Sequence, residues 1–483
     1  MLGNHSTSRT STLARTVDRS RGAALLGAAV LSASLAGHAA ASPFQADDTV
    51  VIEAGKVVVD PSKTDGSGVI EDGVVVVEGG RVTKVGKRGE VEVPWEAEVV
   101  GGPEYTAFPG FVEAYSSRGM DRANEGIDVA PFLDVRDSVD PINVYFQDCL
   151  RWGITTVNVQ QGSDCVVGGK GRVLKPVGIT VDQMTVRPTY GLVLSASPKR
   201  GKSRATQAQA LRDAFGDLHR YLDEIVADAK DGNDRAKREA LFQGRDLEGE
   251  NGKGRAMKSE ADWKVDGLEL IPRGAIDEKQ APLLDLVEGR VPAFFHCGSP
   301  QDVHLALRVA KDNGFLGRTT LVLDDSCWKA ADVIKTAGVP VILTGPLMHT
   351  ETDPVTGEET ETFVAGVFRD AGVPFALSSQ DSSTASLWYQ AARATGLGLT
   401  REQALAAVTS VPANVLGLDA DVGTLSTGRL GNVLLLSGDP LASTTWVEHV
   451  FVEGHHVYDR SKDPRNKILI EGDDPLDYLS PAK

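Results

Sequence analysis

The strongest constraint on the fold is a regular alternation of short apolar strands with longer helical patterns, which runs from Pro109 to Thr409. Such an alternation favours a parallel sheet, either closed into a barrel or open and doubly wound. Because no Gly-rich nucleotide fingerprint follows an early strand, we expect a (β/α)8 barrel over residues 109–412. The expected strands are 155–160, 292–295, 321–323, 341–343 and 375–378, and the expected helices are 205–229, 302–313, 327–337, 387–395 and 401–409.

Both ends of this block are rich in β-forming residues. Residues 49–108 contain three β-branched runs between Gly-rich turn signals, Val57–Val59, Val74–Val77 and Val91–Val93. The β character returns in residues 413–460, with strands expected at 432–436 and 446–452 and a turn at Gly454. We therefore expect the two ends to pair with each other in a small β-sandwich, followed by a tail over residues 461–483.

Residues 1–41 have the order of a secretory signal. Arg15, Arg19 and Arg21 precede an apolar run over residues 23–35, and Ala39-Ala40-Ala41 follows. This order predicts cleavage after Ala41 and an exported protein, in the periplasm, in the cell envelope or secreted; a retained anchor is the alternative. The run is too short and too rich in small residues for a membrane span, and we expect no span after the signal is removed.

Charge excludes some partners. With 483 residues and a net charge of −17, the chain would repel nucleic acid and anionic lipid. The charged residues 230–262 predict a helix extension that ends in a mobile surface loop. The spacing of Cys149, Cys165, Cys297 and Cys327 matches neither a zinc ribbon nor a redox pair, so we expect buried thiols, although export would permit disulfides.

Several motifs resemble a known family. Residues 107–114 (AFPGFVEA) are similar to the opening of the first barrel strand, and residues 153–157 (GITTV) to the second strand, of the amidohydrolase superfamily. Within it, the chain resembles an exported imidazolonepropionase-like subgroup over roughly residues 50–460. The other similar segments are Gly168–Gly171 with Lys175, Leu405–Leu416, Gly423–Leu425 with Gly428, Asp439–Leu441 and Val452–Gly454.

The resemblance implies a (β/α)8 barrel with an added β-sandwich, and hydrolysis of C–N bonds in amides, lactams and related small molecules. Members use one or two divalent metals, which lower the pKa of bound water at the C-terminal mouth of the barrel. A small-molecule substrate or ligand is therefore the expected partner. An acidic barrel of this size often self-associates, so a homo-oligomer is the other expectation.

The implied metal site departs from the family pattern. The His-x-His at the end of strand one corresponds to Tyr115-Ser116-Ser117, and the Asp before it to Glu113. A phenol or a hydroxyl is a poor neutral ligand, so two ligands are lost. The resemblance matches His296 to the fifth-strand histidine, Asp325 to the sixth-strand ligand and Asp381 to the eighth-strand aspartate, the general base.

These three residues could hold at most one zinc, iron or manganese ion, and only weakly. The sequence favours the alternative in which no ion is bound, where His296 is a hydrogen-bonded barrel histidine and Asp381 caps the next helix. We expect Asp325 rather than Asp324 to face the site, because Asp325 stands at the ligand position.

Other residues are candidates for substrate binding at the mouth. These are Tyr115 and Ser117, His349 after the seventh strand, and Lys170, whose Gly-rich loop 168–172 could cradle an anion. Tight turns with positive φ would explain the same glycines. His455-His456 predicts a surface turn rather than a metal site.

Three hypotheses about function follow. The chain is an exported hydrolase of C–N bonds with a reduced, mononuclear site built on His296 and Asp381. Alternatively, it is a catalytically silent relative, a pseudoenzyme that binds a small molecule or a protein at the barrel mouth. In the third hypothesis, the fold is a structural part of an envelope assembly.

Overall fold

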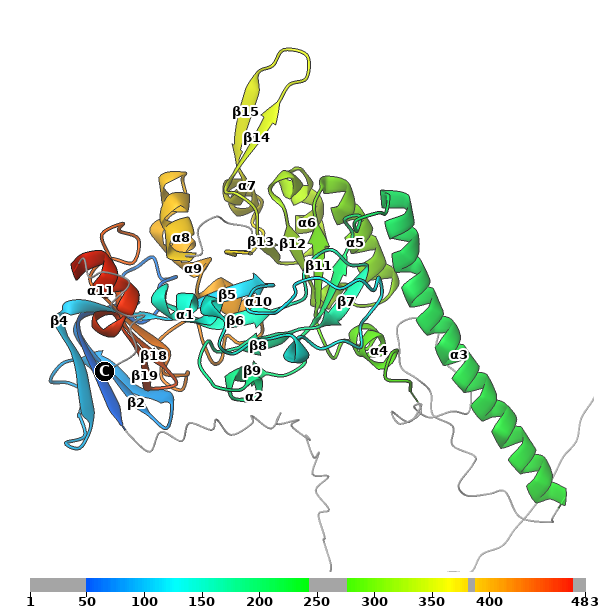
Figure 1. Ribbon diagram of the computed structural model, residues 1–483, viewed down its shortest axis with the longest axis horizontal. Coiled ribbons are helices and arrows are strands. Elements are labelled where there is room, and N and C mark those ends of the chain that lie inside the picture. Colours follow the sequence, from blue (N-terminus) through cyan, green and yellow to red (C-terminus); the bar gives the residue numbers. More distant parts are fainter. Residues whose placement is uncertain (1–48, 243–275, 381–386, 472–483) are drawn as a thin grey trace, which may run out of the picture. The chain divides into compact units, whose positions relative to one another are not determined.

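The computed structural model describes residues 49–242, 276–380 and 387–471, which form a mixed α/β structure (Figure 1). The predicted signal segment 1–41, most of the predicted loop 230–262 and Asp381 lie outside these residues. None of the helices in the described ranges combines the length and apolar composition that crossing a membrane requires.

A seven-stranded sheet joins the two ends of the chain. Its strand order is β19-β18-β17-β4-β1-β2-β3, and β4 pairs antiparallel with β17, Phe108 opposite Leu434. The expectation that the ends pair with each other is thus confirmed. The strands are β1 (Val50–Val58), β2 (Val69–Glu78), β3 (Arg81–Lys87), β4 (Glu98–Pro109), β17 (Val433–Leu436), β18 (Val447–Val452) and β19 (His455–Asp459).

The predicted strand at Val91–Val93 is wrong. The chain turns back after β3, where the amides of Glu90 and Val91 both donate to the Lys87 carbonyl, at 3.0 and 3.3 Å. β3 is the edge strand of the sheet, and the backbone after it forms this turn instead of adding a further strand beside β3.

Most strand pairs of the central block are parallel: β10, β11, β12, β13 and β16 pair in parallel, as do β5 and β6. A six-stranded sheet has the order β16-β13-β12-β11-β10-β7, and a four-stranded sheet the order β5-β6-β8-β9. Strands β7 and β8 run antiparallel to β10 and β6, because the connection over residues 160–166 is too short for a helical crossover of about a dozen residues. The bounds are β5 (Phe111–Ser116), β6 (Ile154–Val159), β7 (Val167–Lys170), β8 (Arg172–Leu174), β9 (Thr185–Arg187), β10 (Leu192–Ser195), β11 (Ala293–Cys297), β12 (Thr319–Leu323), β13 (Val341–Leu343) and β16 (Phe375–Leu377).

The two faces of these strands enter different cores, as the period of two in a strand requires. Phe295, Leu321 and Leu377 join the large core that the helices share. Their neighbours on the opposite face converge in a second core drawn from seven strands, with Val112, Val173, Val193, Phe294, Val322, Ile342 and Ala376 as members.

Strands β5 and β16 do not pair directly. The Val112 amide donates to the Val408 carbonyl at 3.0 Å, and the Leu377 amide donates to the Ala407 carbonyl at 2.9 Å. The backbone of Ala407-Val408 therefore bonds to both strands and connects the two sheets at this side.

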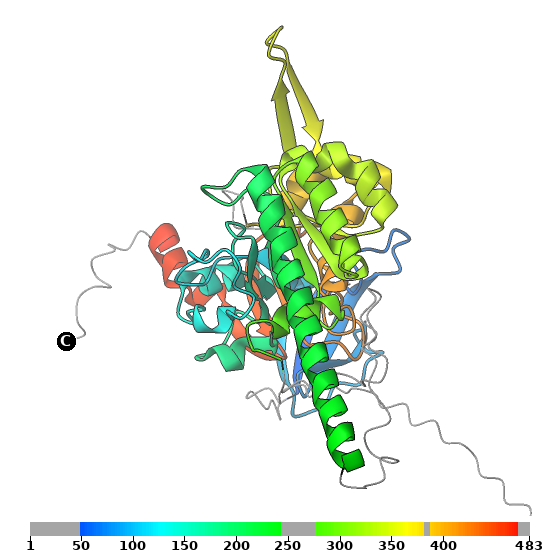
Figure 2. The ribbon, with the colours of Figure 1, turned by 90° about the vertical axis from the view of Figure 1, so that its right-hand side faces the viewer.

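Helices follow the strands at most of the expected positions. They are α1 (Val144–Arg151), α2 (Val181–Met184), α3 (Arg204–Phe242), α4 (Ala281–Val287), α5 (Pro300–Asp312), α6 (Ala331–Ala337), α7 (Val364–Ala371), α8 (Leu387–Gly396), α9 (Arg401–Ala406), α10 (Ser410–Val415) and α11 (Pro464–Glu471). An antiparallel hairpin that the sequence analysis did not predict, β14 (Met348–Thr352) and β15 (Glu359–Phe363), projects from the central block in both ribbon views (Figures 1 and 2).

Candidate functional site

Side chains join the end of β5 to the residues after β16. The Glu113 carboxylate is fully buried and accepts hydrogen bonds from the amide and hydroxyl of Ser379, at 2.9 and 2.5 Å. The Ser378 hydroxyl donates to the Tyr115 carbonyl at 2.8 Å. These bonds hold the carboxyl ends of the first and last strands of the central block against each other.

One residue further along, Ser117 and Gln380 form a two-bond clasp. The Ser117 amide donates to Gln380 Oε1 at 2.7 Å, and Gln380 Nε2 donates to Ser117 Oγ at 2.5 Å. The Arg118 guanidinium also donates to the Gln380 carbonyl, at 3.2 Å. The Ser117 hydroxyl is thus hydrogen-bonded within the protein itself.

Tyr115 faces the interior of the protein. Its side chain is buried, its ring lies 6.4 Å from that of Phe294, and its hydroxyl donates to the Gln161 carbonyl at 2.9 Å. A substrate contact by Tyr115 or Ser117 stays a prediction, and it requires these hydrogen bonds to open.

Burial raises the pKa of the Glu113 carboxyl above its ordinary value of 4.5, and the hydrogen bonds from Ser379 oppose this rise without cancelling it. Glu113 is therefore a buried acid whose proton is held more tightly than that of an exposed glutamate.

His296 is the last residue but one of β11 and lies on the face of Phe294. Its Nε2 lies 3.5 Å from the Asp324 carboxylate, while its Nδ1 is buried and makes no hydrogen bond among the described residues. Asp324 follows β12 on the face of Val322, which shares the inner core with Phe294. Strand alternation thus brings Asp324 to His296.

Asp325 has a different partner. Its Oδ2 lies 2.9 Å from Nδ1 of His349, which stands on β14 at the base of the hairpin. The expectation that Asp325 faces the site stays a prediction. The carboxylate beside His296 is that of Asp324, and the chain turns into a 3-10 helix at Asp325. Two His–Asp pairs therefore flank one another where β12 ends.

Where β11 and β12 end, the described residues do not bring three metal donors together. Within the ranges that the structure covers, no three donor atoms from the two His–Asp pairs come within 4.8 Å of one another, and Asp381 lies outside those ranges. The donor types suit zinc, but their arrangement does not fit an ion. The predicted ligand roles of His296, Asp325 and Asp381 stay predictions, and no chemical step is routed through a metal here.

Lys170 is paired within the protein. Its ammonium lies 3.7 Å from the Asp134 carboxylate, which also pairs with Arg172 at 3.4 Å. The neighbouring glycines have no positive φ, so the turn explanation is wrong. Space explains two of them: a Cβ at Gly169 would lie 2.8 Å from the Leu133 carbonyl oxygen, and one at Gly171 would lie 2.1 Å from the Gln160 amide.

The cysteines are free and buried, in agreement with the sequence analysis. Burial raises the pKa of the Cys165 and Cys327 thiols to about 12, which keeps both in the unreactive thiol form.

A second group of donors was missed. His449, His456 and Asp459 each offer one ligand atom, and these atoms lie within 4.8 Å of one another. The expected turn at His455-His456 is wrong, because both residues belong to β19 and the turn is Glu453-Gly454. A hairpin register built on that turn would have placed His456 and Asp459 beside β18.

Comparison with solved structures reveals the fold. An amidohydrolase from Thermotoga maritima MSB8 is similar with a TM-score of 0.64 and 23% identity, over 85% of this chain and all of that one. An adenosine deaminase from Xanthomonas campestris with bound zinc has a TM-score of 0.48 and 15% identity, over 84% of this chain and 92% of that one. A molinate hydrolase has a TM-score of 0.44 and 18% identity, over 90% of this chain and 98% of that one. No protein-family model and no curated protein matches the sequence.

Proposed function

We propose that this chain is an exported hydrolase of amidohydrolase ancestry that cleaves the C–N bond of a small amide-type molecule without a metal pair. The observation that carries the proposal is the double His–Asp arrangement, His296 with Asp324 and His349 with Asp325. The fold shared with the Thermotoga maritima amidohydrolase supports the ancestry.

The proposal includes a (β/α)8 barrel with one reversed segment, β7–β8, and a β-sandwich built from the seven-stranded sheet. The inner core supports the barrel, because strands on both sides of the Ala407-Val408 bridge send alternate side chains into it. The two His–Asp pairs then lie at its C-terminal mouth, where barrel enzymes keep their active sites.

In this mechanism His349 is the general base. When Nδ1 carries the ring proton and donates a hydrogen bond to Asp325 Oδ2, Nε2 keeps a lone pair and takes a proton from water. The hydroxide attacks the amide carbonyl, and the proton then passes from Nε2 to the leaving nitrogen, which yields a carboxylic acid and an amine. The Asp324 carboxylate, backed by His296, orients the substrate by accepting its N–H.

The test is a hydrolysis screen of lactams and dipeptides with the purified protein, with and without added zinc or manganese. We expect turnover that falls about a hundredfold or more in His349→Ala and Asp325→Asn, because a positioned base contributes that much. His304→Ala, an exposed histidine on α5, is the matched control. Turnover that needs metal, or survives in His349→Ala, would overturn the mechanism.

Binding of a small molecule without turnover is the second candidate function. The Ser117–Gln380 clasp favours it, because the clasp occupies the end of β5. It predicts that the same compounds bind by calorimetry but yield no product. Binding lost in Asp324→Asn and retained in the His304→Ala control would support this candidate.

A further inference from the structure

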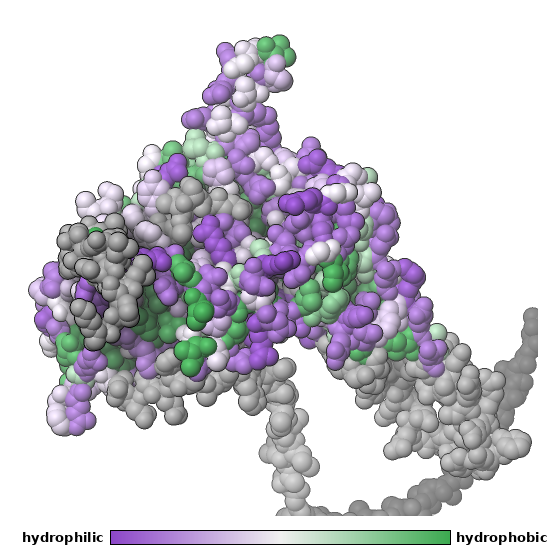
Figure 3. All heavy atoms as spheres, viewed as in Figure 1, coloured by the Kyte–Doolittle hydropathy of each residue, from purple (hydrophilic) through white to green (hydrophobic). Residues whose placement is uncertain are grey.

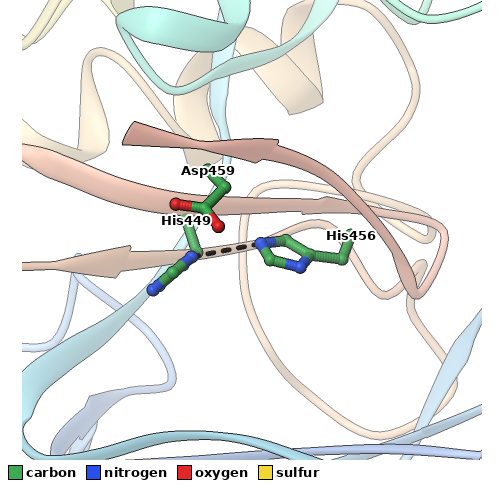
Figure 4. Close-up of side chains that lie close together, drawn as sticks. All are labelled: His449, His456 and Asp459. Atoms are coloured by element: carbon green, nitrogen blue, oxygen red, sulfur yellow. Dashed lines mark hydrogen bonds between the residues drawn. The ribbon is translucent and has the colours of Figure 1, made fainter. Parts of the chain in front are cut away.

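Two histidines and one aspartate meet on neighbouring strands of the seven-stranded sheet. In the β18–β19 hairpin His449 stands opposite Asp459, and a register shift after Val450 sets His456 opposite Phe451. The two rings point at each other, with the Asp459 carboxylate beside His449 (Figure 4). His449 Nδ1 lies 3.1 Å from His456 Nε2.

The donor types are those that zinc takes in proteins. Imidazole nitrogens and a carboxylate oxygen are common ligands of this ion, and the group offers two of the first and one of the second.

Distances also suit a small divalent ion. Two imidazole nitrogens bound tetrahedrally at about 2.0–2.1 Å from zinc lie about 3.3 Å apart. The spacing of 3.1 Å between His449 and His456 is within a small side-chain rotation of that value.

Aromatic neighbours hold both rings in place. The His456 ring stacks on Phe451 with a centroid distance of 4.8 Å, and the His449 ring meets the Tyr105 edge at 5.7 Å. The competing cation, Lys462, lies 3.1 Å from Asp459 but its side chain is 79% exposed, so it can turn away into water.

An open pocket of about 400 Å³ adjoins the group, between α1, β19 and the start of α11. His456, Asp459, Arg151 and Lys462 are among the residues that line it. The pocket gives room for water or an anionic ligand at the fourth position of an ion that has three protein ligands.

We propose that His449, His456 and Asp459 bind one zinc-class divalent ion, at a site separate from the His–Asp pairs of the mouth. The ion replaces the hydrogen bond between the two imidazoles, and Lys462 withdraws from the carboxylate. The site holds β18 and β19 together at the end of the sheet that the two chain ends form.

The experiment is a calorimetric titration of the metal-free mature protein with zinc alone, together with cobalt(II) absorption as a probe of tetrahedral geometry. We expect one site in the wild type and in His304→Ala. In His449→Gln and His456→Gln we expect affinity at least tenfold lower and no visible cobalt band. Glutamine keeps a polar side chain, and circular dichroism checks that each variant is folded.

Three outcomes would overturn the proposal. They are no zinc binding by the wild type, unchanged binding in both glutamine variants, or binding that is lost in His296→Ala but kept in His456→Gln. The last result would place the ion at the mouth. Failure of the hydrolysis screen would leave this site unaffected, so the two proposals fail separately.

Discussion

At the scale of single residues, side chains join the end of β5 to the residues that follow β16. Glu113, Ser117 and their partners Ser379 and Gln380 form this network. A buried carboxyl with a raised pKa has a consequence for stability, because protonation is more favourable in the folded state than in the unfolded state.

Glu113→Gln is expected to change how stability depends on pH. The wild type gains stability from Glu113 below the ordinary pKa of 4.5 and loses it as pH rises to the higher folded pKa. Each unit of raised pKa corresponds to about 1.4 kcal/mol. Urea unfolding from pH 4 to 8 should therefore show a smaller decline for the variant. Parallel curves for the two proteins would contradict the argument.

The buried pair of Lys175 and Glu453 links two of the segments that carry the family resemblance, at 2.7 Å. Removal of one partner leaves a charge with little solvent, so Lys175→Met should lower the free energy of unfolding by about 3 kcal/mol. The double variant with Glu453→Gln should lose clearly less than the sum of the single losses. Additive losses in this cycle would show that the pair is not coupled.

At the scale of elements, the β14–β15 hairpin adds little to the core. Its outer residues are exposed, Val355 at its tip is 90% exposed, and the surface along it is mainly hydrophilic (Figure 3). Its base differs, because His349 there contacts Asp325.

Replacement of residues 351–360 by a two-residue turn should therefore change the free energy of unfolding by less than about 1 kcal/mol. The loss is limited to exposed contacts such as the ion pair of Lys329 with Glu351. The strand pairing at the base of the hairpin remains, with Met348 opposite Phe363 and His349 opposite Thr362. Thermal unfolding measures the change, and a large drop would mean that the hairpin supports the core.

At the scale of the whole molecule, one sheet depends on both chain ends. β17 supplies the ladder partner of β4 and connects it to β18 and β19. A chain that stops at residue 430 leaves Phe108 and its neighbours without the strand that covers them.

Such a truncated protein should fail to fold cooperatively. Loss of three strands exposes the apolar core that Leu434, Val450 and Val452 share with the central helices. Circular dichroism during heating should show no sharp transition, in contrast to the full chain. A cooperative transition near that of the full chain would show that the central block folds by itself.

The proposed export of the protein also concerns the whole chain. Mass spectrometry of the protein recovered outside the cytoplasm should find a mature N-terminus at Ser42, because the predicted cleavage follows Ala41. Recovery of the intact chain from the membrane fraction would instead favour the retained anchor.

The sequence by itself determined where most strands and helices lie. A period of two or of 3.6 in apolar residues is a local property, so 155–160, 302–313 and 341–343 could be assigned without a fold. The strand predicted at 91–93 is absent, because the strand propensity of a segment does not decide whether its backbone pairs with another strand.

Only the tertiary structure decided which side chains meet. His296 met Asp324 rather than Asp325, Ser117 met Gln380, and His449 met His456. Each of these contacts joins two elements whose relative register depends on strand pairing and on turns, which set faces that spacing alone does not reveal. For that reason the positions of the strands followed from local pattern, and the chemistry at their ends did not.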